Sequence, residues 1–197
     1  MRAPVLGLTG GTGCGKSVAA LYFKEHGAHI IDADAISRMI MQPGHAALVE
    51  VAANFPGVLR QDGTLDRKKL GKIVFSDEKK LNKLNAVTHK YIIAEIEAEL
   101  AAHHDVFTVI DAPLLFETNL DRLCDACLCV LADSTTRKKR IMARDGLTEE
   151  DAAARIAAQP ADDYYLSQCR FVLYNTETVD ALHHALDSIL KELICEN

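Results

Sequence analysis

The chain has 197 residues, of which 49% are hydrophobic and 25% charged, a composition typical of a folded globular protein rather than a disordered one. Its formal net charge of −6 argues against nucleic acid and anionic membranes as partners, because both attract clustered cations. No apolar run approaches the ~20 residues of a membrane span, and the first residues lack the apolar core of a signal peptide. We therefore expect a cytoplasmic protein with one main domain, a monomer or weak homo-oligomer, whose partners are small molecules.

The predicted elements begin with a strand over residues 5–9, a glycine-rich turn, and a helix over 16–26 that stops at Gly27. Four more apolar runs without polar alternation predict strands over 28–32, 106–111, 126–131 and 170–174. A closing helix carries apolar residues at three- and four-residue intervals from Val179 to Leu193. Continuous apolar strands separated by helices predict an α/β fold with a five-stranded parallel sheet flanked by helices.

Two excursions interrupt this pattern. About seventy helical residues between the second and third strands are too many for one crossover, so they predict an inserted subdomain. Its signals include the turn QDGTLD and two helix caps, Asp66 and Ser76. The second excursion, over 136–168, is highly charged and is expected to move. We expect a core of 1–33, 105–134 and 171–197, an insert of 34–104 and a lid of 135–170.

The six cysteines are too few for a disulfide framework in a chain of this length, so thiols are expected. Cys124 and Cys127 form one CxxC pair, but no second pair completes a zinc site. The surrounding DACLCVL instead predicts a buried strand with Cys127 and Cys129 on one face. A core role is favoured, and a redox or metal role is the alternative.

The most specific motif is G-x-x-x-x-G-K-[ST], formed by Gly10, Gly15, Lys16 and Ser17 between the first strand and its helix. In such a loop the glycines let backbone N–H groups surround an anion, and the helix adds its positive dipole end. Lys16 would reach the β and γ phosphates, and Ser17 would ligate Mg²⁺. A plain glycine turn is the alternative, but its ordering costs entropy that only a ligand would offset.

Three aspartates follow predicted strands. Asp32 and Asp34 share one side if their strand continues, and Asp34 is placed to accept a proton from an acceptor hydroxyl. A helix cap at Asp34 is the alternative, and a structural or water-binding role is open for Asp32. Asp111 ends the run VFTVID, the usual position of a Walker B acid that holds Mg²⁺, although strand-terminal aspartates also occur for local reasons.

Three arginines, at positions 137, 140 and 144, share one helical face within the charged excursion. A solvated basic stripe, or a chance likeness to a nuclear signal in RKKR, is one interpretation. A mobile helix that closes over ATP and neutralises the transferred phosphoryl group is the other, and the position of the excursion favours it.

Six segments together resemble the dephospho-CoA kinase family over nearly the whole chain: GLTGGTGCGKS, IIDADAISRMIMQPG, DGTLDRKKLGKIVF, LNAVTHKYI, IDAPLLFE and YNTET. The resemblance implies ATP-dependent phosphorylation of the ribose 3′-hydroxyl of dephospho-CoA, which gives coenzyme A and ADP. It also implies a P-loop nucleotide-binding fold with a helical substrate-binding insert and a helical lid, and Mg²⁺ with ATP as co-substrate.

The family resemblance implies roles for individual residues. Asp34 resembles the general base and, with Lys16 and Arg140, makes up the catalytic set. The expected ATP contacts are Gly11, Thr12, Gly13, Cys14, Gly15, Lys16, Ser17, Arg144 and Asn175, the last close to the adenine. The expected dephospho-CoA contacts are Asp34, His89, Leu114, Leu115 and Glu117, and the expected metal ligands are Ser17 and Asp111.

One departure from the family pattern concerns the loop itself. Cys14 stands where a serine is common, and a thiol beside ATP would make the protein sensitive to oxidation. The loop motif also fits three rival functions. A regulatory GTPase is disfavoured because NKLN lacks the guanine-reading aspartate and DAPL lacks the switch glycine. A kinase for another small hydroxyl substrate is the closer rival, and a non-catalytic nucleotide-binding module is the third.

Overall fold

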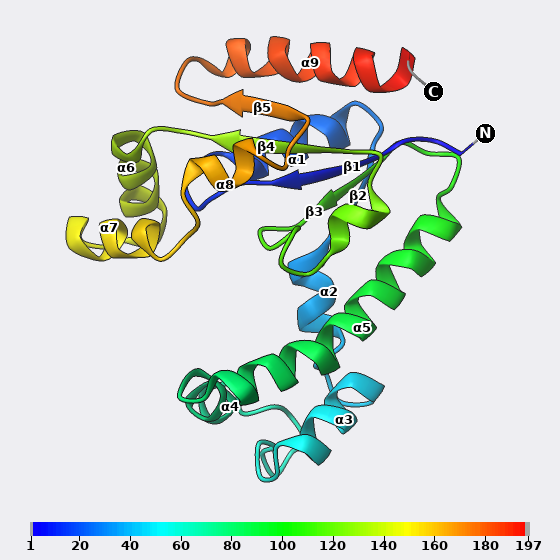
Figure 1. Ribbon diagram of the computed structural model, residues 1–197, viewed down its shortest axis with the longest axis vertical. Helices are drawn as coiled ribbons and strands as arrows, with labels where there is room; N and C mark the ends of the chain where they lie inside the picture. The colour runs from blue at the N-terminus through cyan, green and yellow to red at the C-terminus, as the bar shows by residue number, and fades with distance from the viewer. Residues whose placement is uncertain (1, 196–197) are drawn as a thin grey trace. The chain divides into compact units, whose positions relative to one another are not determined.

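The computed structural model describes residues 2–195, which fold as two compact units. One unit combines the chain up to Ile31 with the chain from His103 onward, and the other is Asp32–Ala102. The first unit holds the sheet, and the second is helical (Figure 1). The finer division into core, insert and lid stays a prediction.

The strands form one sheet in the order β2-β3-β1-β4-β5. β1 is central and pairs in parallel with β3 and β4, and β4 pairs in parallel with β5. The predicted five-stranded parallel sheet is confirmed. Its strands are β1 (Val5–Thr9), β2 (His29–Asp32), β3 (Thr108–Asp111), β4 (Ala126–Leu131) and β5 (Phe171–Tyr174).

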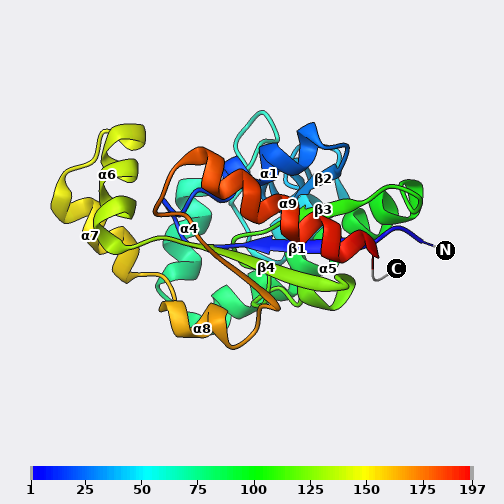
Figure 2. The ribbon, with the colours of Figure 1, turned by 90° about the horizontal axis from the view of Figure 1, so that it is seen from above.

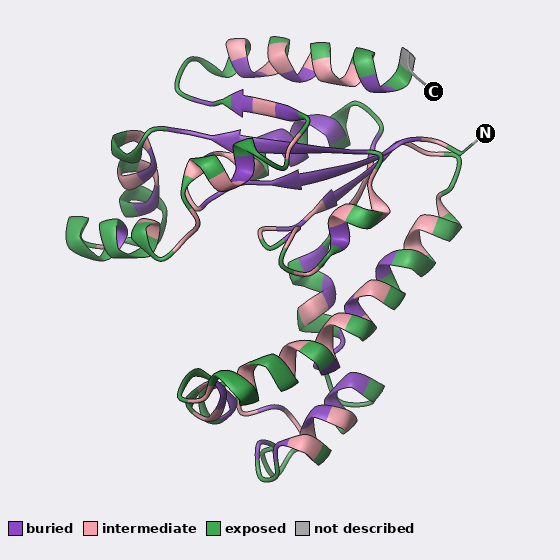
Figure 3. Cartoon of the chain, in the orientation of Figure 1, coloured by how far each residue is buried: buried purple, intermediate pink, exposed green. Residues whose placement is uncertain are grey.

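Helices α1 (Lys16–Glu25) and α9 (Val179–Cys195) lie side by side on one face of the sheet (Figures 1 and 2). The side chains between them and the strands form the main core. Figure 3 colours the central strands mostly as buried, whereas α9 carries buried, intermediate and exposed residues in turn. Phe23 is fully buried at its centre, as are Leu6 and Leu8 of β1. Burial of this many apolar side chains supplies most of the stability of the unit.

The opposite face of the sheet carries the cysteine side of β4. Cys129 and Leu131 pack there against Tyr165, with Phe116 and Cys169 at the margin. Cys127 lies on the same face of β4, next to Gly7. All cysteines whose side chains the structure describes are free thiols, as predicted.

Further helices complete the first unit. The charged excursion contains α6 (Ser134–Asp145), α7 (Glu149–Ala157) and the short α8 (Asp162–Leu166), and a 3₁₀ turn, η1 (Leu120–Leu123), precedes β4. Asp133 caps α6 by accepting from the Thr136 N–H at 2.9 Å, and Gly146 ends that helix in the left-handed conformation (φ 66°). Thr148 then caps α7.

The second unit is built on its longest helix, against which three shorter helices pack. A tight turn precedes the third helix, where the Arg60 N–H donates to the Thr64 carbonyl at 2.8 Å, as the QDGTLD signal predicts. The helices are α2 (Ala33–Met39), α3 (Ala46–Asn54), α4 (Arg67–Phe75) and α5 (Glu78–Ala102).

The helix caps of this unit were predicted only in part. Asp66 caps α4 by accepting from the Lys69 N–H at 3.0 Å, as expected. The prediction that Ser76 caps the next helix is wrong, because its hydroxyl donates backward to carbonyls of α4. Asp77 takes that place and accepts from the Lys79 N–H at 3.0 Å. Serine and aspartate are both good helix caps, but Ser76 ends α4 and Asp77 is the residue directly before α5.

In the described part of the chain, none of the helices has both the length and the apolar character that crossing a membrane requires.

A buried phenol links the two helices on the first face of the sheet. The Tyr22 hydroxyl donates to the Asp187 carboxylate, and burial, followed by this bond and the charge of Asp187, raises the pKa of Tyr22 to about 12. Because the folded-state pKa lies above the ordinary value near 10, the stabilisation is complete below pH ~10 and is lost as the pH rises toward 12. We expect Tyr22→Phe to cost about 1 kcal/mol of unfolding free energy at pH 8.

The measurement is urea unfolding of both proteins across pH 8–11. The gap between them should shrink as the pH rises above 10, because only the wild type loses the phenol bond. A gap that stays constant with pH would assign the effect to packing alone.

Candidate active site

The glycine-rich loop lies between the end of β1 and the start of α1. Gly15 adopts the left-handed conformation (φ 97°), and a β-carbon there would collide with the Asn175 amide. Gly13 is also left-handed (φ 80°), and a β-carbon there would lie 2.8 Å from the main-chain oxygen of Arg137. Both positions therefore require glycine for conformation and for space. The first N–H groups of α1 have no acceptor within the helix. Together with the loop, they form a position where an anion can bind.

Lys16 forms an ion pair with Asp111 across the centre of the sheet. β1 and β3 are adjacent and parallel, and Leu8 pairs with Asp111, so the carboxylate stands at the strand end next to the loop. Both side chains are only 16% exposed, which strengthens their attraction relative to a surface pair. The structure thus brings together the lysine and the strand-terminal acid that the sequence predicts for phosphate and metal binding.

The predicted lid arginines contact the loop directly. Arg140 Nη1 donates to the carbonyls of Gly13 at 3.4 Å and Cys14 at 3.3 Å, and Arg144 Nη2 lies 3.5 Å from Thr12 Oγ1. Asn175 is buried at the end of β5, where its amide nitrogen donates to the Cys14 carbonyl at 2.9 Å. Asn175 therefore holds the loop through its hydrogen bond to Cys14. The sequence analysis had assigned it only a position close to the adenine.

Two further contacts at the loop were not predicted from the sequence. Gln159, just after α7, accepts from the Thr12 N–H at 2.8 Å. Arg137, which the sequence analysis placed with the other arginines of a mobile helix over ATP, is buried and donates to the Thr12 carbonyl at 3.0 Å. No spacing rule joins positions 12, 137 and 159, so only the three-dimensional structure could reveal them.

Asp34 belongs to the second unit, where it is exposed in the first turn of α2. The second strand ends at Asp32, as predicted, so the condition for Asp32 and Asp34 to share one side of a continuing strand is not met, because α2 begins at Ala33. Asp32 caps this helix and accepts from the Ala35 N–H at 2.8 Å. The alternative that Asp34 serves as the cap is therefore wrong, and the Asp34 carboxylate does not cap α2.

The expected substrate residues are distributed over both units. His89 lies half-buried within α5, and burial lowers its pKa, which favours the neutral imidazole. After β3, Leu114 is 57% exposed and Glu117 is exposed as well. Leu115 is fully buried, and a β-carbon at Gly7 would lie 2.8 Å from it. Leu115 therefore has a packing role, and Leu114 is the accessible member of the pair.

Comparison with protein families shows which family this chain belongs to. The family model for dephospho-CoA kinase matches residues 4–180, which include the loop, Asp34, Asp111 and the arginines of α6. The chain belongs to the dephospho-CoA kinase family.

Individual relatives agree with this assignment. The chain is 41% identical over 193 residues to the dephospho-CoA kinase of Anaeromyxobacter dehalogenans, covering 96% of this chain and 92% of that protein. Among solved structures, a Thermus thermophilus protein, TT1252, has a TM-score of 0.85 at 32% identity and covers 98% of this chain and 99% of its own. A dephospho-CoA kinase from Campylobacter jejuni has a TM-score of 0.70 at 26% identity, with 98% of each chain covered.

More distant likenesses concern the fold alone. Shikimate kinase from Acinetobacter baumannii has a TM-score of 0.53 at 13% identity. Membership in the dephospho-CoA kinase family settles the choice against a regulatory GTPase, which the loop motif by itself left open.

The loop cysteine of this family member is less reactive than its sequence position suggests. Cys14 is 1% exposed, and burial raises its pKa, although the charge of Arg137 partly opposes the rise. A thiol is oxidised or alkylated through its thiolate, which this burial disfavours. Burial of the thiol argues against the expected sensitivity of Cys14 to oxidation, which stays a prediction.

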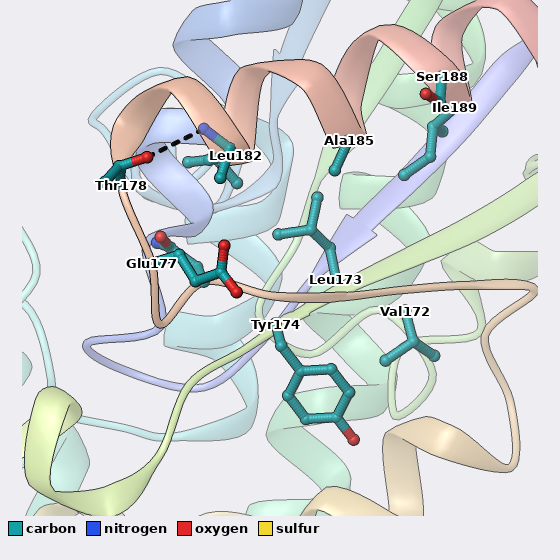
Figure 4. A pocket seen from close by; sticks show the side chains of 11 residues that line it. Val172, Leu173, Tyr174, Glu177, Thr178, Leu182, Ala185, Ser188 and Ile189 are labelled. Carbon is teal, nitrogen blue, oxygen red and sulfur yellow. Dashed lines mark hydrogen bonds between the residues drawn. The ribbon is translucent and has the colours of Figure 1, made fainter.

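A groove of about 390 Å³ runs between β5 and α9 in this dephospho-CoA kinase family member (Figure 4). Asn175, whose amide braces Cys14, is one of its lining residues, and Leu182 and Ile189 line it from the helix. The groove thus adjoins a residue that touches the phosphate loop. Its position next to the strand end is consistent with the general rule that ligands bind at the carboxyl ends of parallel strands.

Proposed function

We propose that this protein transfers the γ-phosphoryl group of ATP to the ribose 3′-hydroxyl of dephospho-CoA, giving coenzyme A and ADP. The observation that carries the proposal is the Lys16–Asp111 pair beside the glycine loop, in a chain that matches the dephospho-CoA kinase family over residues 4–180. Phosphoryl transfer needs alignment and neutralisation of charge more than covalent chemistry, and these residues supply both.

ATP would bind with its phosphates on the loop. The N–H groups from Gly13 to Ser17 surround the β-phosphate, and Lys16 leaves Asp111 to reach the β and γ oxygens. The Thr12 N–H is already engaged by Gln159, so Thr12 contributes through its position rather than as a donor to phosphate. Arg140 and Arg144, which touch the loop from α6, stabilise the charge of the group in transfer.

Mg²⁺ fits the oxygen atoms present at the loop. Ser17 has an exposed hydroxyl at the start of α1, and Asp111 holds a carboxylate at the adjacent strand end. Hydroxyl and carboxylate oxygens are the ligands that Mg²⁺ prefers, together with phosphate. The ion, when bound, neutralises charge on the β and γ phosphates.

The acceptor hydroxyl must lose a proton as the new P–O bond forms and the bond to ADP breaks. Asp34 is the proposed base, because it is exposed at a helix start and carries no capping bond. His89, Leu114 and Glu117 are the proposed dephospho-CoA contacts, and Asn175 with the adjoining groove lies on the proposed path of the ATP base.

The test is a comparison of acceptors. The protein is incubated with ATP and Mg²⁺, and ADP release is followed with dephospho-CoA, adenosine, uridine or gluconate. We expect dephospho-CoA to be preferred by a large factor and coenzyme A to appear in a 1:1 ratio with ADP. Preference for another acceptor would overturn the substrate assignment and leave the fold intact.

A further inference from the structure

The main chain of Thr12, within the glycine loop, is held on both sides by the charged excursion. Its N–H donates to Gln159 Oε1 at 2.8 Å, and its carbonyl accepts from Arg137 Nε at 3.0 Å. Arg137 Nη2 also donates to the same Gln159 oxygen at 2.7 Å. Three hydrogen bonds therefore close a ring through three residues, which we call the Thr12 clamp.

Arg137 is a buried cation whose hydrogen-bond partners in the clamp are both neutral. Its exposed fraction is 6%. Within residues 2–195, no ion pair joins its guanidinium to a carboxylate. Burying a charge without a counter-charge is costly, so a bound anion would be stabilised strongly next to this group.

The arginine also lies directly on the loop. A β-carbon at Gly11 would be 2.5 Å from Arg137 Nη2, and the main chain of Arg137 packs against Gly13. The charge of Arg137 influences the thiol of Cys14 on the same loop, which indicates that its field reaches this segment. The groups shown near the Arg137 side chain are thus the loop and Gln159, and its charge also influences the Tyr165 phenol.

We propose that Arg137 and Gln159 are positioning residues for ATP: the Thr12 clamp holds the loop open for the triphosphate, and the unneutralised charge of Arg137 strengthens the attraction. This inference rests on the proposed function, since it assumes that the loop binds ATP. Because the loop is already ordered, ATP binding does not include the entropic cost of ordering it. A fixed cation in a position with little water also attracts phosphate more strongly than a cation at the surface does.

A purely mechanical brace is the competing explanation, and Gln159→Glu separates the two. The carboxylate accepts both hydrogen bonds, so the clamp survives and gains an ion pair with Arg137. If the clamp is only a brace, thermal stability rises and ATP binding is unchanged. If the charge of Arg137 serves ATP, the melting temperature holds or rises while ATP affinity falls about tenfold.

Two further variants complete the experiment. Arg137→Gln keeps an N–H donor for the Thr12 carbonyl but removes the charge, and it should also weaken ATP binding about tenfold. Lys139→Gln removes one positive charge from the exposed side of α6, so it matches the charge change of the other two variants. Its ATP affinity should stay within about twofold of the wild type, because exposed charges are screened.

The measurements are ATP affinity by calorimetry, melting temperature, and kcat and KM with dephospho-CoA. The inference requires KM for ATP to rise more than kcat falls in both clamp variants. Normal ATP affinity in Gln159→Glu overturns the inference, even if the wild-type protein converts dephospho-CoA normally and the proposed function stands. Failure of the wild-type protein to bind ATP overturns the proposed function and this inference together.

Discussion

Lys16→Ala is expected to lower kcat/KM for dephospho-CoA phosphorylation by roughly 10³-fold or more. The lysine is the cation that the loop places nearest the β and γ phosphates, and no other side chain on α1 can take its position. ATP binding should weaken as well, because the ammonium attracts phosphate in both the ground state and the transition state.

The measurement is steady-state ADP release together with calorimetric ATP binding. Lys24→Ala is the matched control, because it removes a lysine from the exposed last turn of the same helix. Lys16→Ala also removes the partner of the Asp111 carboxylate, so its melting temperature is compared with that of Lys16→Arg, which retains a cation. Turnover by Lys16→Ala within tenfold of the wild type would contradict the role assigned to this residue.

Asp34→Asn is expected to lower kcat by roughly 10²- to 10⁴-fold, the usual contribution of a general base, with ATP affinity nearly unchanged. Asparagine fills the same space but cannot accept the proton of the ribose hydroxyl. The fold should tolerate the change, because Asp32 rather than Asp34 caps α2 and Asp34 is exposed. The lost favourable contact with the helix dipole costs at most about 1 kcal/mol.

Glu78→Gln is the matched control for Asp34→Asn. It removes one carboxylate from the first turn of another helix in the same unit, α5, so it has the same effect on charge and on a helix dipole. The control should keep wild-type turnover. If both variants lose activity alike, the effect belongs to the charge of the unit, and if neither does, Asp34 is not the base.

The sequence predicted the sheet well because its signals are local. Each strand is a continuous apolar run bounded by turn residues, and the strand bounds in the structure differ from the expected ones by two residues or fewer. The loop motif was equally clear, since the conformation and the close neighbours at Gly10 and Gly15 leave glycine as the only residue that fits.

Predictions failed where several local solutions competed. Asp32 and Asp34, like Ser76 and Asp77, are each able to cap a helix, and the choice depends on where the preceding element ends. The Thr12 clamp could not be predicted from the sequence for another reason. Arg137 lies 125 residues from Thr12 and Gln159 lies 147 residues from it, so no sequence periodicity connects these residues. Burial, which gives Leu115 and Cys14 their packing roles, is likewise a property of the assembled sheet.

The central position of β1 has a consequence for synthesis on the ribosome. The motif residues leave the exit tunnel first, yet β1 pairs with β3 and β4, and the Cys14 carbonyl is held by Asn175, 161 residues later. Until the last strand has emerged, the nascent polypeptide lacks the contacts that give the loop its shape. We therefore expect the chain to form these non-local contacts before the loop binds ATP, so that ATP does not guide the early steps of folding.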